Sequence, residues 1–262
     1  MLDPAQGVEM NGNFFRIGMM VLALLAAMSM PAYAKTYSYS TGSTTTGGVF
    51  GVSVDAKATF DVSAGSMVVT LTNLQSNITN VGQDISSLWF TVNNGSSILS
   101  LSGASVTLSG NLIDIGSNGV MSTAGTLTDV KLGTKGTSTE HWSAGQGTSQ
   151  FYFNDLNGGG QPYQTIIGPP GSNGKYGSVN NSIYGNTSHN PFIQNQATFR
   201  IQAAGLLATS TISDIKVGFG TNDCNTPTVR MVPEPGSLAL LAIGALAFAG
   251  VLRRKTIEET HA

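Results

Sequence analysis

Residues 50–62 read FGVSVDAKATFDV, and apolar residues occupy every second position of this stretch. One set comprises Phe50, Val52, Val54, Ala56, Ala58, Phe60 and Val62, and the other comprises Gly51, Ser53, Asp55, Lys57, Thr59 and Asp61. Successive side chains of a β-strand point to opposite faces of a sheet, so the pattern predicts one buried face and one wet face. We expect one long strand here, or two strands joined by a bend.

Further strand-like runs follow at short intervals, at residues 67–72, 88–93, 98–101, 104–108, 112–115, 126–132, 150–153, 199–203 and 215–219. Turn-forming residues separate several of them, as in Asn93-Asn94-Gly95, Ser109-Gly110-Asn111 and Gly116-Ser117-Asn118-Gly119. About ten short strands with such spacing predict an all-β fold, specifically a single jelly-roll-like β-sandwich. A closed barrel or a β-solenoid is the alternative, although no fixed repeat is visible. One short helix-like patch covers residues 202–207.

The central part of the chain, residues 35–231, is long enough for one domain with a substantial core. It carries nine acidic and eight basic residues. This near-neutral balance argues against nucleic acid as a partner, because phosphate neutralisation needs clustered lysine and arginine. The chain has one cysteine, Cys224, so an intramolecular disulfide is impossible and the core must rely on packing. This cysteine is expected to be inert, or to pair between molecules.

The N-terminus has the pattern of a secretory signal peptide. Arg16 precedes an apolar run at residues 17–30, which is followed by Pro31-Ala32-Tyr33-Ala34. A basic start, a short apolar segment and an Ala-x-Ala site predict cleavage by signal peptidase after Ala34. The apolar run is shorter than the ~20 residues that a membrane span needs. Residues 1–34 are therefore predicted to be removed during export.

The C-terminus contains three elements in a fixed order. Val232-Pro233-Glu234-Pro235 comes first, an apolar run at residues 238–252 follows, and the basic cluster Arg253-Arg254-Lys255 comes last. The apolar run is just long enough to enter a bilayer, and the basic cluster would stay in the cytoplasm. This arrangement, over residues 232–255, resembles the PEP-CTERM sorting signal of Gram-negative bacteria. A plain membrane anchor is the alternative.

The resemblance implies an exosortase as partner. It also implies an inner-membrane intermediate held by a transmembrane helix at residues 238–252, with residues 256–262 as a cytoplasmic tail. The final location would be the cell surface or the extracellular matrix. Two segments of the body, residues 68–74 and 81–88, are also similar to segments in PEP-CTERM proteins of unassigned function. That similarity implies no residue roles.

A long segment at residues 154–197 is rich in Gly, Asn, Ser and Pro, and it is expected to be a loop. It contains Tyr163, Tyr176 and Tyr184 among small polar residues. Tyrosine rings on adaptable loops are typical of binding surfaces, and they can stack on sugar rings. These three residues are therefore the predicted ligand-binding residues, with extracellular polysaccharide as the ligand. The alternative is that the rings pin the loop onto the sheet.

The sequence shows no catalytic constellation of a known type, and we predict no catalytic residue, no metal site and no cofactor. His141 and His189 are expected to be ordinary surface residues. The run Asn154-Asp155-Leu156-Asn157 offers oxygen ligands of the kind calcium prefers, but it lacks the spacing of a calcium loop. We therefore expect an exported protein without catalytic activity. A carbohydrate-binding or adhesive module is the first alternative, and a secreted hydrolase with paired carboxylates is the second.

Overall fold

The structure of the protein, a computed structural model, describes residues 34–43, 51–135, 141–156, 162–184, 189–221, 226–227 and 229–232. The predicted signal peptide up to residue 33, Phe50, Cys224 and the chain beyond Val232 lie outside the described residues. The described residues form strands and one short 3-10 helix, and they contain no α-helix. The prediction of an all-β fold is confirmed.

The elements are β1 (Lys35–Ser40), β2 (Ala56–Ser63), β3 (Ser66–Asn73), η1 (Val81–Gln83), β4 (Ile85–Asn94), β5 (Ser97–Ile98), β6 (Ser105–Ile115), β7 (Met121–Lys131), β8 (Ser143–Gln146), β9 (Phe151–Asn154), β10 (Ile166–Ile167), β11 (Phe192–Gln194), β12 (Gln196–Gln202), β13 (Thr211–Phe219) and β14 (Arg230–Val232).

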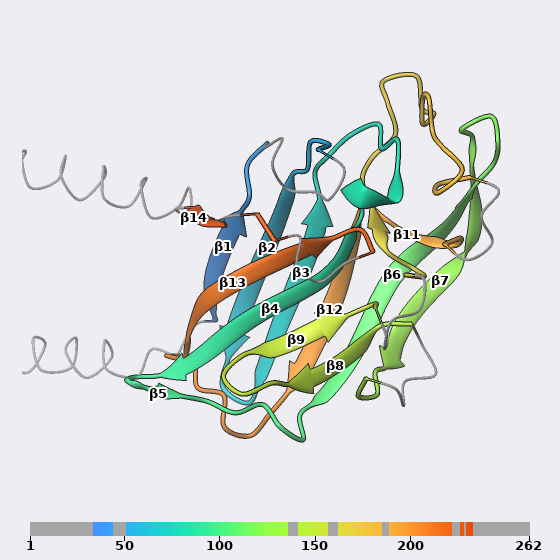
Figure 1. Cartoon of the computed structure of the whole chain (residues 1–262). Coiled ribbons are helices and arrows are strands. Elements are labelled where there is room, and N and C mark those ends of the chain that lie inside the picture. Colours follow the sequence, from blue (N-terminus) through green and yellow to red (C-terminus); the bar gives the residue numbers. More distant parts are fainter. Residues whose placement is uncertain are drawn as a thin grey trace, which may run out of the picture. The chain divides into compact units, whose positions relative to one another are not determined.

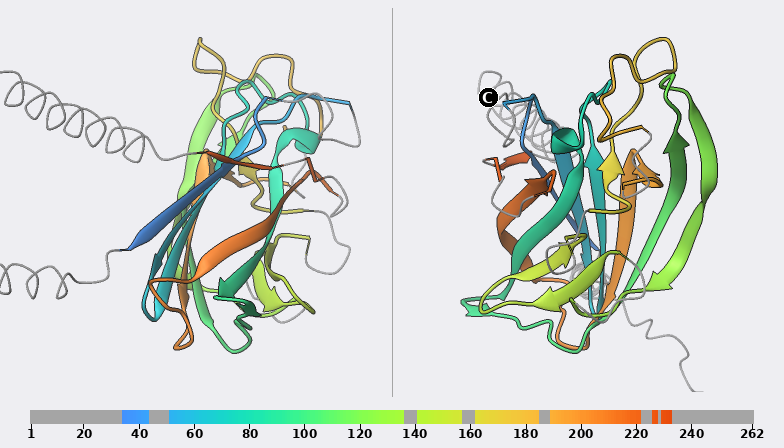
Figure 2. Two further views of the ribbon diagram at one scale, coloured as in Figure 1. Left: turned by 90° about the vertical axis from the view of Figure 1, so that its left-hand side faces the viewer. Right: turned by 45° about the vertical axis from the view of Figure 1, so that its right-hand side comes forward.

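Hydrogen bonds connect all of these strands into one 14-stranded sheet. Its main path runs β14-β1-β2-β3-β12-β6-β11-β10-β4-β9-β8, while β13 and β5 pair with β4 and β7 pairs with β6. In Figure 1, β13, β4, β9 and β8 cross in front of β2, β3 and β12, and the short strands β10 and β11 lie where the path passes between these layers. Figure 2 shows the same layers from two further sides.

The alternation predicted for residues 50–62 is confirmed from Val54 to Val62, whereas Val52 is partly exposed like its neighbour Ser53. Ala56, Ala58, Phe60 and Val62 are completely buried in β2, whereas Lys57, Thr59 and Asp61 are partly exposed. Val54, just before the strand, is also completely buried. The sequence pattern therefore identifies the face of β2 that forms the core.

Aromatic rings connect the two layers through the main core. The ring of Phe60 in β2 meets that of Phe90 in β4 edge to face, with 5.0 Å between centroids. The ring of Phe153 in β9 stacks on that of Phe199 in β12 at 4.0 Å and 7°. Buried aromatic pairs contribute about 0.5–1.5 kcal/mol beyond the area that they bury. These contacts hold strands of the two layers together.

A second, smaller hydrophobic cluster lies beside the main core. Its buried members are Ile78, Val81, Ile113, Ile115, Ile167, Tyr176, Ile183 and Phe192. Four of them come from the segment at residues 154–197, which also contributes β10 and β11 to the sheet. The expectation of a loop holds for most of the described part of this segment, and β10 lies in the piece at residues 165–167 that could be a strand. The expectation is wrong at β11 and at the start of β12. The isoleucines at 166, 167, 183 and 193 in this Gly/Asn-rich background give it enough apolar surface to fold onto the sheet.

Two local predictions are also wrong. Ser109-Gly110-Asn111 is not a turn, because residues 105–115 form the single strand β6. Gly110 instead accompanies a register shift in the β6–β7 ladder, and a Cβ there would lie 2.8 Å from Ile193 Cγ2. The glycine thus marks a bulge and a close approach rather than a chain reversal. The helix-like patch at residues 202–207 is the end of β12 followed by a turn.

Val54→Asp is expected to lower the free energy of unfolding by roughly 3 kcal/mol or more, because it places an unpaired charge in the core. Asp55→Val, at a partly exposed position next to it, should change stability by about 1 kcal/mol or less. Chemical denaturation of the purified protein measures both. Similar losses in the two variants would contradict the assignment of the buried face.

Candidate functional site

The three tyrosines predicted to bind a ligand do not form one exposed surface. Tyr176 is 2% exposed, belongs to the second hydrophobic cluster and donates its hydroxyl hydrogen to the Gly168 carbonyl at 2.6 Å. Tyr163 and Tyr184 are partly exposed. The rings of Tyr163 and His141 lie 3.9 Å apart. Tyr176 therefore pins the segment, whereas Tyr163 and Tyr184 remain accessible candidates.

The two histidines of the body differ in their surroundings. His141 is exposed beside Tyr163. His189, expected on the surface, is buried, and its Nδ1 lies 2.6 Å from the Pro162 carbonyl oxygen. That contact joins the two ends of the segment from Pro162 to His189. It gives His189 a structural partner and no route to a substrate.

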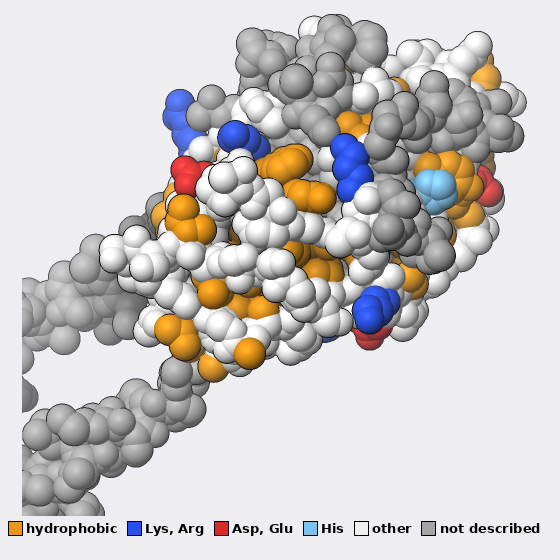
Figure 3. All heavy atoms as spheres, turned by 60° about the horizontal axis from the view of Figure 1, so that its bottom comes forward, with side chains coloured by type: hydrophobic (Ala, Val, Ile, Leu, Met, Phe, Trp, Pro, Cys, Tyr) orange, Lys and Arg blue, Asp and Glu red, His pale blue; other side chains and the backbone are white. Residues whose placement is uncertain are grey.

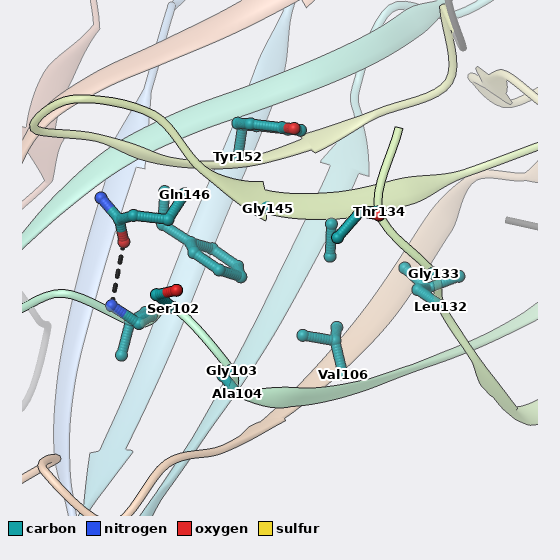
Figure 4. Close-up of a pocket in the computed structure, with 13 residues that line it drawn as sticks. Ser102, Gly103, Ala104, Val106, Leu132, Gly133, Thr134, Gly145, Gln146 and Tyr152 are labelled. Carbon is teal, nitrogen blue, oxygen red and sulfur yellow. Dashed lines mark hydrogen bonds between the residues drawn. The ribbon is translucent and has the colours of Figure 1, made fainter. Parts of the chain in front are cut away.

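A surface pocket lies between β8, β9 and the chain that leads into β6. It has a volume of about 270 Å³, and its lining includes Val106, Leu132 and Phe151 as well as polar groups. Figure 4 shows Gln146, Gly145 and Thr134 along one side, with Ser102 and Gly103 opposite. Gln146 Oε1 accepts a hydrogen bond from the Leu101 N–H at 2.9 Å. The pocket offers an apolar lining with a few polar atoms at its edge, which suits a small uncharged ligand.

An aromatic pair that the sequence analysis did not single out lies next to this pocket. Tyr152 of β9 lines the pocket, and its ring packs on that of Trp89 in β4 at 4.7 Å with a tilt of 38°. The two residues are cross-strand partners, and both are partly exposed. The sequence does contain a signal for them, because each occupies the position that alternates with buried residues of its own strand. Adjacent, partly exposed rings offer apolar surface on which sugars can stack.

A pair of buried carboxyl groups lies at the edge of the main core. Asp84 directly precedes β4 and is 0% exposed, and Asp155 directly follows β9 and is 2% exposed. The ladder between β4 and β9 brings them together. The Asp155 N–H donates to the Ser86 carbonyl at 2.9 Å, which places Asp155 opposite Ser86. Asp84 lies two residues before Ser86, where the β4–β13 ladder shifts its register.

These carboxyl groups have few hydrogen-bond partners. Thr165 Oγ1 donates to Asp84 Oδ2 at 3.3 Å. Asp84 Oδ1, both carboxyl oxygens of Asp155 and the Ser86 hydroxyl are buried without a hydrogen-bond partner. Buried polar groups in folded proteins are nearly always paired, so an unpaired cluster of this kind requires an explanation.

Burial determines the ionisation of the pair. Loss of hydration raises the pKa of Asp84 well above its usual value; the Thr165 hydroxyl opposes this rise, and the nearby Asp155 adds to it. Burial likewise raises the pKa of Asp155, although the Tyr163 N–H lies close enough to oppose it. That N–H does not reach normal hydrogen-bond geometry with either Asp155 oxygen. Burial therefore disfavours the charged form of both carboxyl groups.

Neither the sequence pattern nor any motif indicates Asp84 as a site residue. Asp155 appears in the sequence analysis only within a run of possible calcium ligands. Because the two side chains are almost completely buried, they do not line an open cleft like that of a glycosidase with two carboxylates. In the described part of the chain, no group of three or more His, Cys, Asp or Glu side chains could hold a metal ion.

The last described strand of the body pairs with the first. β14 pairs antiparallel with β1, with Ser38 opposite Val232 and Ser40 opposite Arg230. Val232 is exposed, and it is the last described residue. The other predicted sorting residues, Pro233, Glu234, Pro235, Arg253 and Arg254, lie outside the described residues. Within the part of the chain that the structure describes, no helix has the length and apolar character needed to cross a bilayer.

Comparison with known protein families gives one result. Residues 232–255 match the PEP-CTERM protein-sorting motif. This motif indicates an exported protein that is targeted to an exosortase, which passes through a membrane-anchored intermediate on its way to the cell surface. The predicted sorting signal and its boundaries are confirmed.

The body of the protein has no comparable match. No curated protein and no solved structure matches the chain. The similarity expected between residues 68–74 or 81–88 and the bodies of other PEP-CTERM proteins is therefore without support. The chemistry of the body has to be inferred from its own residues.

The free energy of unfolding is expected to fall as the pH rises above about 4, measured with a chelator present so that no metal ion binds to the acid pair. Both aspartates have a folded-state pKa above the ordinary 3.8, so the folded protein keeps protons that the unfolded chain releases. Asp84→Asn should flatten this pH profile and raise stability at neutral pH. Asp114→Asn, at an exposed position of β6, should leave the profile unchanged. Denaturant titrations at several pH values test this, and an identical slope in wild type and Asp84→Asn would refute the prediction.

Proposed function

We propose that this chain is a non-catalytic protein of the cell surface or the exopolysaccharide matrix, delivered there as a folded β-body by signal peptidase and an exosortase. The observation that carries the proposal is the position of the sheet relative to the two processing signals. β1 begins at Lys35, directly after the predicted signal-peptidase site, and β14 ends at Val232, where the sorting motif begins.

Cleavage on both sides would leave the sheet intact. The pairing of β1 with β14 lies between the two sites, so a chain trimmed to residues from 35 to about 235 would keep every described strand. Before trimming, residues 238–252 would hold the protein in the inner membrane, with the basic cluster on the cytoplasmic side. The body would fold on the outer side during this stage.

The same proposal includes the finer description of the fold. The body is a β-sandwich in the sense that two layers of one continuous sheet enclose the main core, in a jelly-roll-like arrangement. Support comes from the ring contacts between β2 and β4 and between β9 and β12. Such a scaffold needs no disulfide to remain folded outside the cell, which fits a chain with a single cysteine.

Intact-mass analysis of protein recovered from the surface of an exosortase-bearing host tests the sorting proposal. The mature chain should begin at Lys35 and lack the residues beyond about Pro235. In a host without the exosortase, the intact mass should be larger by the mass of the uncleaved C-terminal segment, and the N-terminus should still be Lys35. Mature protein that still carries Arg253 and Arg254 would replace the sorting proposal with a plain anchor.

A second candidate function is carbohydrate binding, because a partly exposed aromatic pair lies beside a pocket. The Trp89–Tyr152 pair would stack against the C–H face of a sugar, and Gln146 and Ser102 in the pocket would bond to its hydroxyls. Figure 3 shows one face of the body on which lysine, arginine and acidic side chains are scattered singly among uncharged groups. Because charged side chains are sparse there, binding of an uncharged sugar should depend little on salt.

Retention on a column of the host's own polysaccharide would distinguish two locations for such a site. Trp89→Ala should abolish retention if the aromatic pair binds the sugar. The double variant Tyr163→Ala/Tyr184→Ala should abolish it if the originally predicted tyrosines do. Tyr176→Phe is the control, since it removes a buried hydrogen bond and should lower the melting temperature without affecting retention. Wild-type protein that is not retained would remove carbohydrate binding as a function.

A further inference from the structure

We propose that Asp84 and Asp155 bind a calcium ion inside the body, with the Ser86 hydroxyl as a third ligand. The site lies where the start of β4, the end of β9 and the approach to β10 meet. It is independent of the sorting signal and goes beyond the delivery of the protein to the surface.

The pairing of β4 with β9 brings Ser86 and Asp155 together. Ser87 and Asn154 are register partners, and the Asp155 N–H donates to the Ser86 carbonyl, so Asp155 and Ser86 face each other across the ladder. Cross-strand neighbours project from the same face of a sheet. Asp84 lies two residues before Ser86 and directly before β4, and the electrostatic influence of Asp155 on Asp84 agrees with their proximity.

The oxygen atoms of this cluster lack the partners that such burial normally demands. Asp84 Oδ1 and both Asp155 carboxyl oxygens are unpaired. The Ser86 hydroxyl is a separate observation, because Ser86 is 0% exposed, uncharged and also without a partner. Its place opposite Asp155 on the ladder puts it on the same face as the Asp155 carboxyl group. A bound cation would satisfy all four oxygens, whereas protonation alone leaves acceptor positions empty.

The residue next to Thr165 also has a buried oxygen without a partner. Gln164 is 7% exposed, and its Oε1 has no hydrogen-bond partner. It directly precedes Thr165, whose hydroxyl bonds to Asp84. Gln164 also has a positive φ of 64°, a left-handed conformation that is uncommon for residues other than glycine. Its carbonyl is held by the Trp142 indole N–H at 2.8 Å, so the chain beside the acid pair is fixed in place.

The chemistry of the donors selects a hard divalent cation. The available ligands are carboxylate, hydroxyl and amide oxygens, with no sulfur and no imidazole among them, which disfavours zinc and copper. Two carboxylates match the charge of one divalent ion. Calcium accepts six to eight oxygens in flexible geometry, including neutral ones, whereas magnesium demands a near-ideal octahedron and tends to keep its waters. A mostly buried site with several neutral oxygens therefore fits calcium better.

The position of the site gives the ion a structural role. Ile85 and Ile166 belong to the main core, while Val81 and Ile167 belong to the second cluster. Asp84 lies between Val81 and Ile85 in the sequence, and Thr165 directly precedes Ile166 and Ile167, so both residues adjoin members of the two clusters. An ion bound there would connect the end of β9 and the start of β10 to β4. Calcium is also present at high concentration outside cells, where sites of even modest affinity fill.

The experiment uses the full-length protein in detergent, unfolded and refolded in EDTA so that the buried site equilibrates, and then dialysed against CaCl₂. Calcium per chain is measured by elemental analysis, and the melting temperature is followed against free calcium. We expect about one ion per chain and a rise of about 5 °C or more at saturating calcium. Magnesium at the same concentration should give a clearly smaller shift, and an equal shift would overturn the assignment to calcium.

Three variants separate binding from folding. Asp84→Asn keeps the shape of the side chain, removes its charge and should lose the calcium-dependent rise in melting temperature. Ser86→Ala should weaken calcium binding by about tenfold, as expected for the loss of one neutral ligand. Asp114→Asn, an exposed aspartate of β6, is the matched control and should respond like wild type.

Two results would overturn the proposal. One is wild-type protein that refolds, contains no calcium and melts at the same temperature with and without millimolar CaCl₂. The other is an equal calcium response in wild type and Asp84→Asn, which would place any bound calcium elsewhere. If Asp84→Asn does not fold, the calcium content of wild type and the affinity of Ser86→Ala still decide the question.

Discussion

The packing of aromatic rings between the two layers is the interaction on which the rest of the structure depends. The sequence has one cysteine, so no disulfide within the chain can hold the layers together. Phe60 against Phe90 and Phe153 against Phe199 connect β2 with β4 and β9 with β12. By fixing β4 and β9 over the opposite layer, these contacts also fix everything at the ends of those strands, including the buried acid pair, the pocket and the aromatic pair.

The buried acid pair lowers the stability of the core that this packing forms. Three carboxyl oxygens and a hydroxyl without partners weaken a core unless something satisfies them. Loss of hydration raises the pKa of both aspartates, so a metal-free body at neutral pH must either keep protons on them or hold charge in the interior. A cation would turn the same arrangement into a stabilising connection between the two hydrophobic clusters. The stability of the body would then depend on the cations in its surroundings, because the pairing of β4 with β9 brings the two aspartates together.

The functional surfaces lie on the layer that contains β4, β9 and β8. The Trp89–Tyr152 pair and the pocket beside Gln146 are on this layer, and the acid pair lies at its edge. The pairing of β1 with β14 belongs to the opposite layer and brings the two ends of the body together. Delivery and any recognition would therefore use different parts of one sheet, so removal of the sorting signal leaves the candidate surfaces unchanged.

The sequence by itself determined the all-β class, the buried face of β2 and the sorting motif at residues 232–255, because each depends on local order or period along the chain. It did not reveal that Gly110 sits in a continuous strand or that Tyr176 is buried. Both follow from the approach of distant segments, Ile193 in one case and the second cluster in the other. Asp84 and Asp155 are likewise neighbours only through the register of β4 and β9. A periodic pattern fixes which way a side chain points, whereas only the pairing of distant strands decides what it meets there.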